Sequence, residues 1–367
     1  MLKDELTVIR DKYADERVTE IQDVEDEIDI EDLIEEEECV FTLTDGGYIK
    51  RTAVSEYAAQ GKGGQGRKGM STKEEDSVNT VFTASTHDYI LFFTDRGRVF
   101  RKKGYQIAES GRTARGTNLI NILQVEQGEK VSAMIHTRDV ESEDRFLVMI
   151  TRSGTVKRLS VAALKNLRNN GLRVLTLEEG DELICVRETD GNQAILIATH
   201  DGMTICFHED DVRCMGRDAC GVRGIKLREG DWVVGAARAK RDHQVLMITE
   251  HGYGKRTEMD EYIRADGPQK RGGFGLKGYN VTEKTGSVVG VKVVSDADDI
   301  LVINDAGVII RMAAAGISTY SRAAQGVKIM NLEEGVKVIS FARTDHEEDE
   351  EEPADAQAAG YAPAGEE

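Results

Sequence analysis

A short apolar run that ends in Thr or Asn, with a glycine three positions further on, recurs six times along this 367-residue chain. The first copy reads V-F-T-L-T-D-G-G-Y-I-K-R (Val40 to Arg51) and the last reads I-L-V-I-N-D-A-G-V-I-I-R (Ile300 to Arg311). The turn glycines are separated by 50, 57, 48, 50 and 55 residues: Gly47, Gly97, Gly154, Gly202, Gly252 and Gly307. A period of this size with strand–turn–strand units predicts a propeller-like array or solenoid.

Each copy predicts a β-hairpin, because the apolar run has strand length and the glycine can take a positive φ where the chain reverses. A second turn recurs later in several units, as in Glu178-Glu179-Gly180, and an apolar stretch follows it. About four strands per unit suits a blade, and a closed ring would protect the sheet edges. The sequence therefore predicts an all-β ring of six blades at about 39–87, 88–144, 145–193, 194–243, 244–298 and 299–344.

A polar loop with basic residues and glycine occupies one equivalent place in most units. Its copies include Arg112–Gly116, Arg168–Gly171, Arg217–Gly221 and Arg322–Gly326, and the first and fifth units carry the longer loops Gln60–Gly69 and Gln269–Gly278. A ring would present them as a repeated set of positive loops.

The formal charge of −19 is unevenly distributed along the chain. Residues 1–38 hold 17 acidic and 4 basic residues, and residues 345–367 hold 10 acidic residues and no Lys or Arg. The repeat body, 39–344, is left with +4. A mildly basic body between acidic segments predicts an interaction surface for a polyanion with acidic tails beside it.

The two ends are predicted to differ from the repeats. Leu2, Leu6, Ile9 and Tyr13 are spaced as on a coiled-coil helix, so residues 1–22 are predicted to be a helix, followed by an acidic linker over 23–38. Residues 345–367 are predicted to be a disordered tail, which either competes with the polyanion for the body or only keeps the chain soluble. The chain has no long apolar run or signal peptide, which indicates a cytoplasmic protein without a membrane partner. Five cysteines, mostly within predicted strands, indicate reduced and buried thiols.

The six glycine turns and the loop from Gln60 to Gly66 resemble the C-terminal domain of the bacterial DNA gyrase A subunit, and the resemblance covers nearly the whole chain. It implies a six-bladed β-pinwheel whose basic rim wraps duplex DNA. The family's box, Q-R-R-G-G-[K/R]-G, is matched by Gln60, Lys62, Gly63, Gly64 and Gly66, whereas Gly61 and Gln65 replace basic residues and Arg67 and Lys68 follow. The resemblance further implies no catalytic residue and no cofactor in this chain, because ATP and Mg belong to other parts of an A2B2 holoenzyme with the gyrase B subunit.

The candidate DNA-binding residues are therefore the box-like loop and basic residues on the strands and the polar loops. Outside the box they are Lys50, Arg51, Arg101, Lys102, Lys103, Arg115, Lys157, Arg158, Arg168, Lys255, Arg256, Lys270, Arg271, Lys277, Arg311 and Arg322. The repeated arginine four places after each turn glycine has two interpretations, a rim contact or a structural ion pair. The preceding Lys50, Lys157 and Lys255 alternate to the opposite strand face and are predicted to face solvent or DNA.

Other interpretations of single motifs are weaker. Gly61–Gly66 and Gly273–Gly278 match the dinucleotide pattern G-x-G-x-x-G, but no βαβ unit surrounds either. Cys206, His208, Cys214 and Cys220 lack a C-x-x-C pair, so no metal is predicted. No Walker loop or Ser/His/Asp arrangement stands out. The best interpretation is a non-catalytic domain that wraps DNA so that gyrase can introduce negative supercoils; the alternatives are the equivalent domain of topoisomerase IV, a protein-interaction scaffold and, third, an enzyme.

Overall fold

The computed structural model describes residues 2–13, 30–44, 46–57, 67–68, 78–111, 113–138, 140, 142–168, 170–263 and 267–345. The chain divides into two compact units, residues 1–35 and 36–367. The first unit holds helix α1 (Leu2–Tyr13), where Leu6, Ile9 and Tyr13 are exposed, and the 3-10 turn η1 (Ile30–Leu33). No helix in the described residues is long and apolar enough to cross a membrane. The segments predicted as an acidic tail beyond Asp345 and as the box, Gln60–Gly66, lie outside the described residues.

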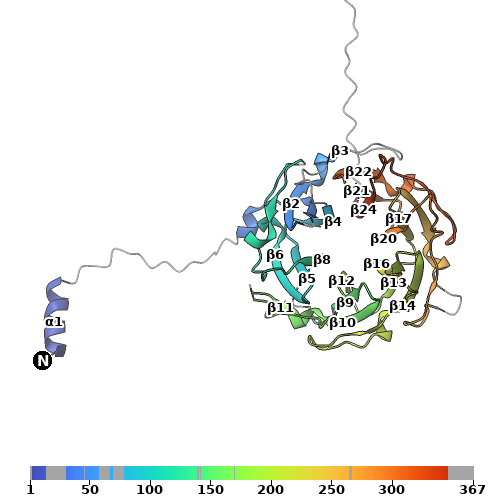
Figure 1. Ribbon diagram of the computed structural model, residues 1–367. Coiled ribbons are helices and arrows are strands. Elements are labelled where there is room, and N and C mark those ends of the chain that lie inside the picture. Colours follow the sequence, from blue (N-terminus) through green and yellow to red (C-terminus); the bar gives the residue numbers. More distant parts are fainter. Residues whose placement is uncertain are drawn as a thin grey trace, which may run out of the picture. The chain divides into compact units, whose positions relative to one another are not determined.

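The second unit is a ring of six four-stranded antiparallel sheets, as the sequence predicted (Figure 1). The inner strands face the centre of the ring: β4 (Val78–Ser85), β8 (Val131–Thr137), β12 (Leu183–Thr189), β16 (Val233–Ala239), β20 (Val288–Val294) and β24 (Val338–Asp345).

The hairpins that carry the repeat form the two middle strands of each blade. The first strands are β1 (Glu38–Thr44), β5 (Tyr89–Thr94), β9 (Phe146–Thr151), β13 (Ala194–Thr199), β17 (Gln244–Thr249) and β21 (Asp298–Asn304). The second strands are β2 (Tyr48–Ala53), β6 (Arg98–Lys103), β10 (Thr155–Ser160), β14 (Met203–His208), β18 (Tyr253–Glu258) and β22 (Val308–Ala313). All six are followed by a short 3-10 turn: η2 (Val54–Glu56), η3 (Gly104–Gln106), η5 (Val161–Leu164), η6 (Glu209–Asp211), η7 (Met259–Glu261) and η8 (Ala314–Gly316). A further 3-10 turn, η4, spans Leu119–Asn121.

The fourth, outermost strand of each blade comes from the next repeat along the chain. These two-residue strands are β7 (Thr117–Asn118), β11 (Leu172–Arg173), β15 (Val222–Arg223), β19 (Leu276–Lys277), β23 (Val327–Lys328) and β3 (Arg67–Lys68). Strand β3, from the first repeat, pairs with β22 of the last blade and so closes the ring. Every blade is therefore completed by its neighbour, an arrangement that the repeat pattern did not reveal.

The turn chemistry explains the recurrent letters of the repeat. All six turn glycines have positive φ, and a Cβ on Gly97 would lie 2.0 Å from the carbonyl oxygen of Leu175. The Thr or Asn three positions before the glycine accepts the glycine N–H with its carbonyl. In five blades its side-chain oxygen also accepts the N–H that follows the glycine, as Thr94 Oγ1 accepts from Arg98 at 3.2 Å. The residue types are thus required by the reversal itself.

The core is divided into six apolar clusters, one at each contact between neighbouring blades. Leu91 and Phe93 of β5 pack with Leu147 and Met149 of β9, and equivalent pairs recur around the ring. The cluster that contains Val40 also contains Leu301, so the first and last blades share a core as well as a strand. Both faces of the middle strands are buried in this way, which explains their continuous apolar runs.

Candidate nucleic-acid interface

An outer rim of basic residues runs along the edge strands of the ring. We define the outer rim as Arg173, Arg223, Lys277 and Lys328, the second residues of β11, β15, β19 and β23, all of which are exposed. Lys68 of β3 holds the same position in the last blade, and Asn118 of β7 in the first. None of the four rim cations forms an ion pair with a carboxylate of the described residues. Four cations without a carboxylate partner, repeated around a ring, are suited to contact a regularly spaced row of phosphates.

Sequence reasoning identified Lys277 and Lys68 but missed Arg173, Arg223 and Lys328. A signal for them is present, because each follows a loop glycine by two positions: Gly171-Leu172-Arg173, Gly221-Val222-Arg223 and Gly326-Val327-Lys328. The triplet was missed because the outer strands have only two residues and so show no strand periodicity.

The polar loops lie beside the outer rim, because each loop leads directly into an outer strand. Arg168 and Lys270 are exposed, and Lys270 Nζ pairs with Asp211 at 2.8 Å. Arg271 donates to the carbonyl oxygens of Asp211 and Arg223 (2.8 and 2.9 Å), so it fixes the loop and is half-buried. Arg322 similarly donates to the carbonyl of Lys277 at 2.6 Å. The structure thus places part of the loop cations at the surface and uses the others to hold the loops.

A loop glycine brings this cationic loop against the neighbouring strand. Gly275 has a φ of +75°, and a Cβ there would lie 2.1 Å from the carbonyl oxygen of Thr204 in β14. Any side chain at this position would push the loop away from the blade, so the glycine is required for the loop to pack closely against β14.

The strand lysines Lys50, Lys157 and Lys255 were predicted to face solvent or DNA, and that prediction is wrong. All three are fully buried. Lys157 Nζ donates to the carbonyl oxygens of Val174, Arg217 and Ala219 at 2.6–2.8 Å. Lys255 Nζ donates to those of Ser321 and Arg322, and Lys50 Nζ to that of Gly111. The three lysines do lie on the strand face opposite to the arginines, but the polar loop of the next repeat covers that face.

Two of these buried lysines titrate below the usual range. Burial lowers the pKa of both Lys157 and Lys255 to about 8. The position alternates around the ring, because the corresponding residues in the second, fourth and sixth blades are apolar: Phe100, Ile205 and Ile310. Charged and apolar anchors therefore hold alternate loops.

The arginines four places after the turn glycines serve the structure. Arg51 pairs with Glu37 and Glu109 (both 3.1 Å), Arg158 with Asp210 (2.9 Å), Arg256 with Asp296, and Arg311 with Asp299 (2.7 Å). Their side chains are 4–13% exposed, which leaves little surface for a phosphate. Arg101 stacks its guanidinium over the Tyr89 ring, as does the ammonium of Lys103. Of the two interpretations open from sequence, the structure favours the ion pair.

The remaining candidates have intermediate exposure. Lys102 lies half-buried on β6, and Lys103 also donates to the carbonyl of His87 at 3.0 Å. Arg115 stacks over Tyr48 with its guanidinium 5.2 Å from the ring centre. Of the box-like segment the structure describes only the backbone of Arg67 and Lys68, which form β3.

Two of the five cysteines differ from prediction. Cys39, Cys185 and Cys206 are buried, but Cys214 and Cys220 are exposed on the polar loop before β15. Burial raises the pKa of the Cys206 thiol to about 12, so that thiol stays protonated. Among the described residues, the thiols of Cys206, Cys214 and Cys220 do not converge with His208 on one point.

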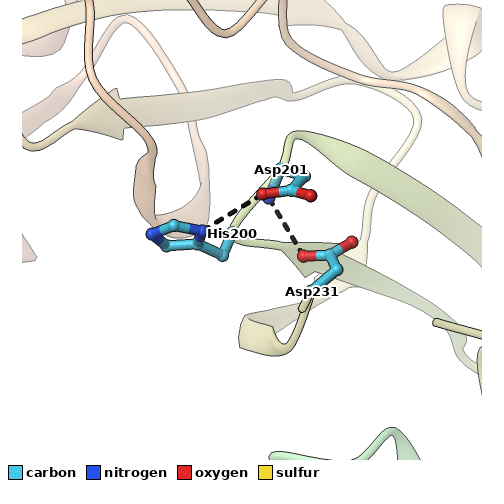
Figure 2. Close-up of side chains that lie close together, drawn as sticks. All are labelled: His200, Asp201 and Asp231. Atoms are coloured by element: carbon cyan, nitrogen blue, oxygen red, sulfur yellow. Dashed lines mark hydrogen bonds and ion pairs between the residues drawn. The ribbon is translucent and has the colours of Figure 1, made fainter. Parts of the chain in front are cut away.

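The described residues bring one His/Asp cluster together, His200, Asp201 and Asp231 (Figure 2). Asp231 accepts the N–H groups of Asp201 and Trp232 at 3.0 and 2.9 Å, and the His200 ring stacks on Trp232 with 3.8 Å between centroids. Asp181 does the same in the third blade, where it accepts the Ser153 N–H at 2.9 Å. The cluster therefore stabilises a hairpin turn that repeats between blades.

Known proteins share this six-unit architecture. A family model described as "DNA gyrase C-terminal domain, beta-propeller" matches six segments, residues 40–85, 88–138, 145–187, 193–240, 243–295 and 298–345. The DNA gyrase A subunit of Staphylococcus epidermidis (strain ATCC 12228) is 45% identical over 356 residues, which cover 95% of this chain and 39% of that protein. The corresponding protein of Staphylococcus aureus (strain MRSA252) is 45% identical over 96% of this chain and 40% of its own length. The chain thus spans about two fifths of these relatives.

Two solved structures have the same ring. A DNA gyrase A C-terminal domain matches with a TM-score of 0.76 and 27% identity, over 84% of this chain and 99% of that one. The C-terminal domain of a DNA topoisomerase IV matches with a TM-score of 0.63 and 25% identity, over 85% and 94%. Both likenesses extend over most of the chain.

Proposed function

This chain belongs to the family of DNA gyrase C-terminal domains, and on that basis we propose that it binds duplex DNA along the outer rim and bends it around the ring. The observation that carries the proposal is the exposed cation repeated on successive edge strands without a carboxylate partner. The domain itself has no catalytic role; it serves the parent topoisomerase by shaping the DNA.

The energetics require many contacts spread over an arc. Bending about 20–30 bp by 40–90° costs on the order of 1–6 kcal/mol, so contacts at one blade alone would be insufficient. A ring offers equivalent contacts at successive blades, and each neutralised phosphate releases counterions. Because the contacts go to the backbone, the domain selects bendable duplex rather than a base sequence.

In the assembled protein we propose that this wrap presents a second DNA segment to the cleavage gate, so that strand passage introduces negative supercoils. The partners would then be duplex DNA, the gyrase B subunit, and the rest of the gyrase A chain, in the cytoplasm. ATP and Mg would act in those other parts.

A salt titration tests the binding surface. The log of the association constant for a linear duplex should fall linearly with log salt, with a slope of about −0.9 per phosphate contacted. A slope near zero would rule out an electrostatic wrap. Bending is measured in parallel from fluorescence transfer between the labelled ends of the duplex.

The equivalent role in topoisomerase IV is a second candidate, and two observations favour considering it. The box-like loop has lost two of the basic residues that the gyrase family carries there, and the topoisomerase IV domain has the same ring. The assembled enzyme distinguishes them on circular DNA: gyrase introduces negative supercoils, whereas topoisomerase IV relaxes and decatenates only.

A further inference from the structure

The inner strands of the ring enclose a cavity of about 1290 Å³, which the proposed wrap on the outer rim does not use. Its lining comes from all six inner strands, β4, β8, β12, β16, β20 and β24, and carries residues of both charges. The carboxylates of the lining come from the first three blades, whereas the fourth, fifth and sixth blades contribute cations and no carboxylate to it. This excess of positive charge on one side is the feature that points to a ligand.

The acidic side of the cavity is internally paired. Glu36 accepts from Arg138 at 2.6 Å, and Asp88 contacts His136 at 2.8 Å and Arg138 at 3.3 Å. Glu37 pairs with Arg51 on β2. These carboxylates, near the first and second blades, are therefore already neutralised by cations of their own side.

The opposite side gathers cations without matching carboxylates. Arg187 of β12 and Lys292 of β20 hold equivalent register positions, and Arg238 of β16 and Arg343 of β24 hold the next one. Arg187 donates to the carbonyl oxygens of Ala236 and Val186 rather than to an acid. No carboxylate of the described residues forms an ion pair with Arg238 or Lys292, and Arg343 reaches Asp298 only at 3.8 Å.

These four side chains, which we call the channel cations, repel one another. Burial, together with the positive charges of Arg187 and Arg343, lowers the pKa of Lys292 to about 7. Burial and the positive charge of Arg187 also lower the pKa of Arg238. Glu188, which lies 3.6 Å from Arg145, is the acidic group that acts on this side, and the channel cations outnumber it. Such crowding is costly without a counter-charge.

The fourth blade carries a short side chain at the position of two channel cations. Ala237 stands there where Arg187 and Lys292 stand in the third and fifth blades. The inner strands also expose an unpaired backbone edge toward the cavity, since they are the last strands of their sheets.

We propose that the centre of the ring is a binding site for a small oxyanion with several charges, such as inorganic pyrophosphate or a triphosphate chain, held by Arg187, Arg238, Lys292 and Arg343. The cavity, at about 1290 Å³, is slightly larger than a typical small-molecule site of about 300–1,000 Å³. Guanidinium groups match the paired oxygens of phosphate, and a chain of phosphates can contact cations from several strands at once.

The test is calorimetric titration of the full chain with inorganic pyrophosphate and, separately, tripolyphosphate, in Mg-free buffer at about 0.15 M salt, where loose surface attraction is screened. We expect saturable binding of one anion per chain. The variant Lys292→Met should raise the dissociation constant at least tenfold, and so should Arg238→Gln. The matched control Lys328→Met removes one charge from the outer rim and should change it less than twofold.

Thermal unfolding separates lost binding from lost folding. Without the anion, Lys292→Met should unfold at the same temperature as the parent or higher, because it removes like-charge repulsion; with pyrophosphate the parent should gain more than the variant. The absence of saturable binding, or equal weakening by Lys328→Met, would overturn the proposal.

The acidic run Glu347–Glu352 is the competing source of oxyanions, and it follows β24 directly along the chain. Replacing its six carboxylates by Gln in the full chain should leave pyrophosphate affinity unchanged if a free oxyanion is the ligand. A gain of tenfold or more would instead show that the chain's own carboxylates fill the site, and would overturn a free oxyanion as its occupant.

Discussion

The ammonium nitrogen of Lys157 lies 2.6 Å from the carbonyl oxygen of Arg217, so a buried strand residue of the third repeat holds an exposed cationic loop of the fourth. The contact links a buried strand to a loop of the proposed DNA-binding surface. The strand lysine carries no charge to the surface, but it fixes the backbone from which Arg217 and the following rim residue Arg223 project.

Removing this lysine should loosen the loop. In Lys157→Met, a side chain of similar length cannot donate, and the carbonyls of Val174, Arg217 and Ala219 lose their shared partner. We expect a loss of about 1–3 kcal/mol in unfolding free energy and faster amide hydrogen exchange in Arg217–Gly221. The exposed Lys226→Met is the control, and should affect neither. Unchanged exchange in the loop of Lys157→Met would contradict a positioning role.

Stability should rise with pH through the titration of the buried lysines. Burial lowers the pKa of Lys157 and Lys255 to about 8, against about 10.5 in the unfolded chain. Between these values the unfolded chain binds more protons, so each lysine contributes increasing stability as pH rises. Between pH 7 and pH 9.5 we expect the free energy of unfolding to rise by about 2 kcal/mol per lysine.

The measurement is urea unfolding of the parent and of the double variant Lys157→Met, Lys255→Met at pH 7.0 and 9.5. The thiols of Cys39 and Cys206, which ionise in this range only in the unfolded chain, are common to both proteins and cancel in the comparison. If the stability difference between parent and variant is the same at both pH values, the lysines do not titrate as inferred.

The outer rim should account for much of the salt dependence of DNA binding. Arg173→Ala, Arg223→Ala and Lys328→Ala should each reduce the slope of log affinity against log salt by about 0.9, because each removes one phosphate contact. Stability should stay within about 0.5 kcal/mol of the parent, since the three side chains are exposed. Asn118→Ala, at the equivalent uncharged position, should leave the slope unchanged. A slope equal to that of the parent in all three variants would exclude the outer rim as the DNA path.

The sequence was sufficient for the ring because its signals are local. Thr94, Gly97 and the apolar run before them satisfy one hairpin by themselves, and six copies at a fixed period predict six blades. The exchange of the outer strand between repeats could not be predicted from the sequence. Val222 and Arg223 pair with β10 of the preceding repeat, and a two-residue strand shows no periodicity.

The candidate site was predicted only in part, for a related reason. A strand period gives the face on which Lys157 lies but not what covers that face, and the covering loop arrives from the next repeat. Arg311 likewise needed the position of Asp299, twelve residues earlier on the paired strand, to be recognised as half of an ion pair. Which cations are free is a property of the packed ring.

The buried pair Arg311–Asp299 should be costly to break. The two side chains are 4% and 1% exposed, and Arg311 Nε lies 2.7 Å from Asp299 Oδ2. In Arg311→Met the carboxylate loses its guanidinium in the interior of the last blade, so we expect a loss of about 3–5 kcal/mol in unfolding free energy. Arg96→Met is the control, because its pair with Glu126 is exposed and should contribute at most about 1 kcal/mol. Equal losses in both variants, by chemical denaturation, would refute the structural role of the buried pair.

The box-like loop should control bending more than binding. The loop Gln60–Gly66 precedes β3, whose Arg67 and Lys68 pair with Ile309 and Val308 and close the ring. Replacing Gln60–Gly66 by alanine and serine while keeping Arg67 and Lys68 preserves that closure, so unfolding free energy should stay near that of the parent. One loop carries few of the phosphate contacts, so affinity for a linear duplex should fall less than about threefold. The chain passes through this segment from the first blade into β3 of the last blade, so we expect its replacement to leave the bend incomplete and end-to-end fluorescence transfer to drop. Transfer as high as in the parent, at saturating protein, would show that the loop has no part in the wrap.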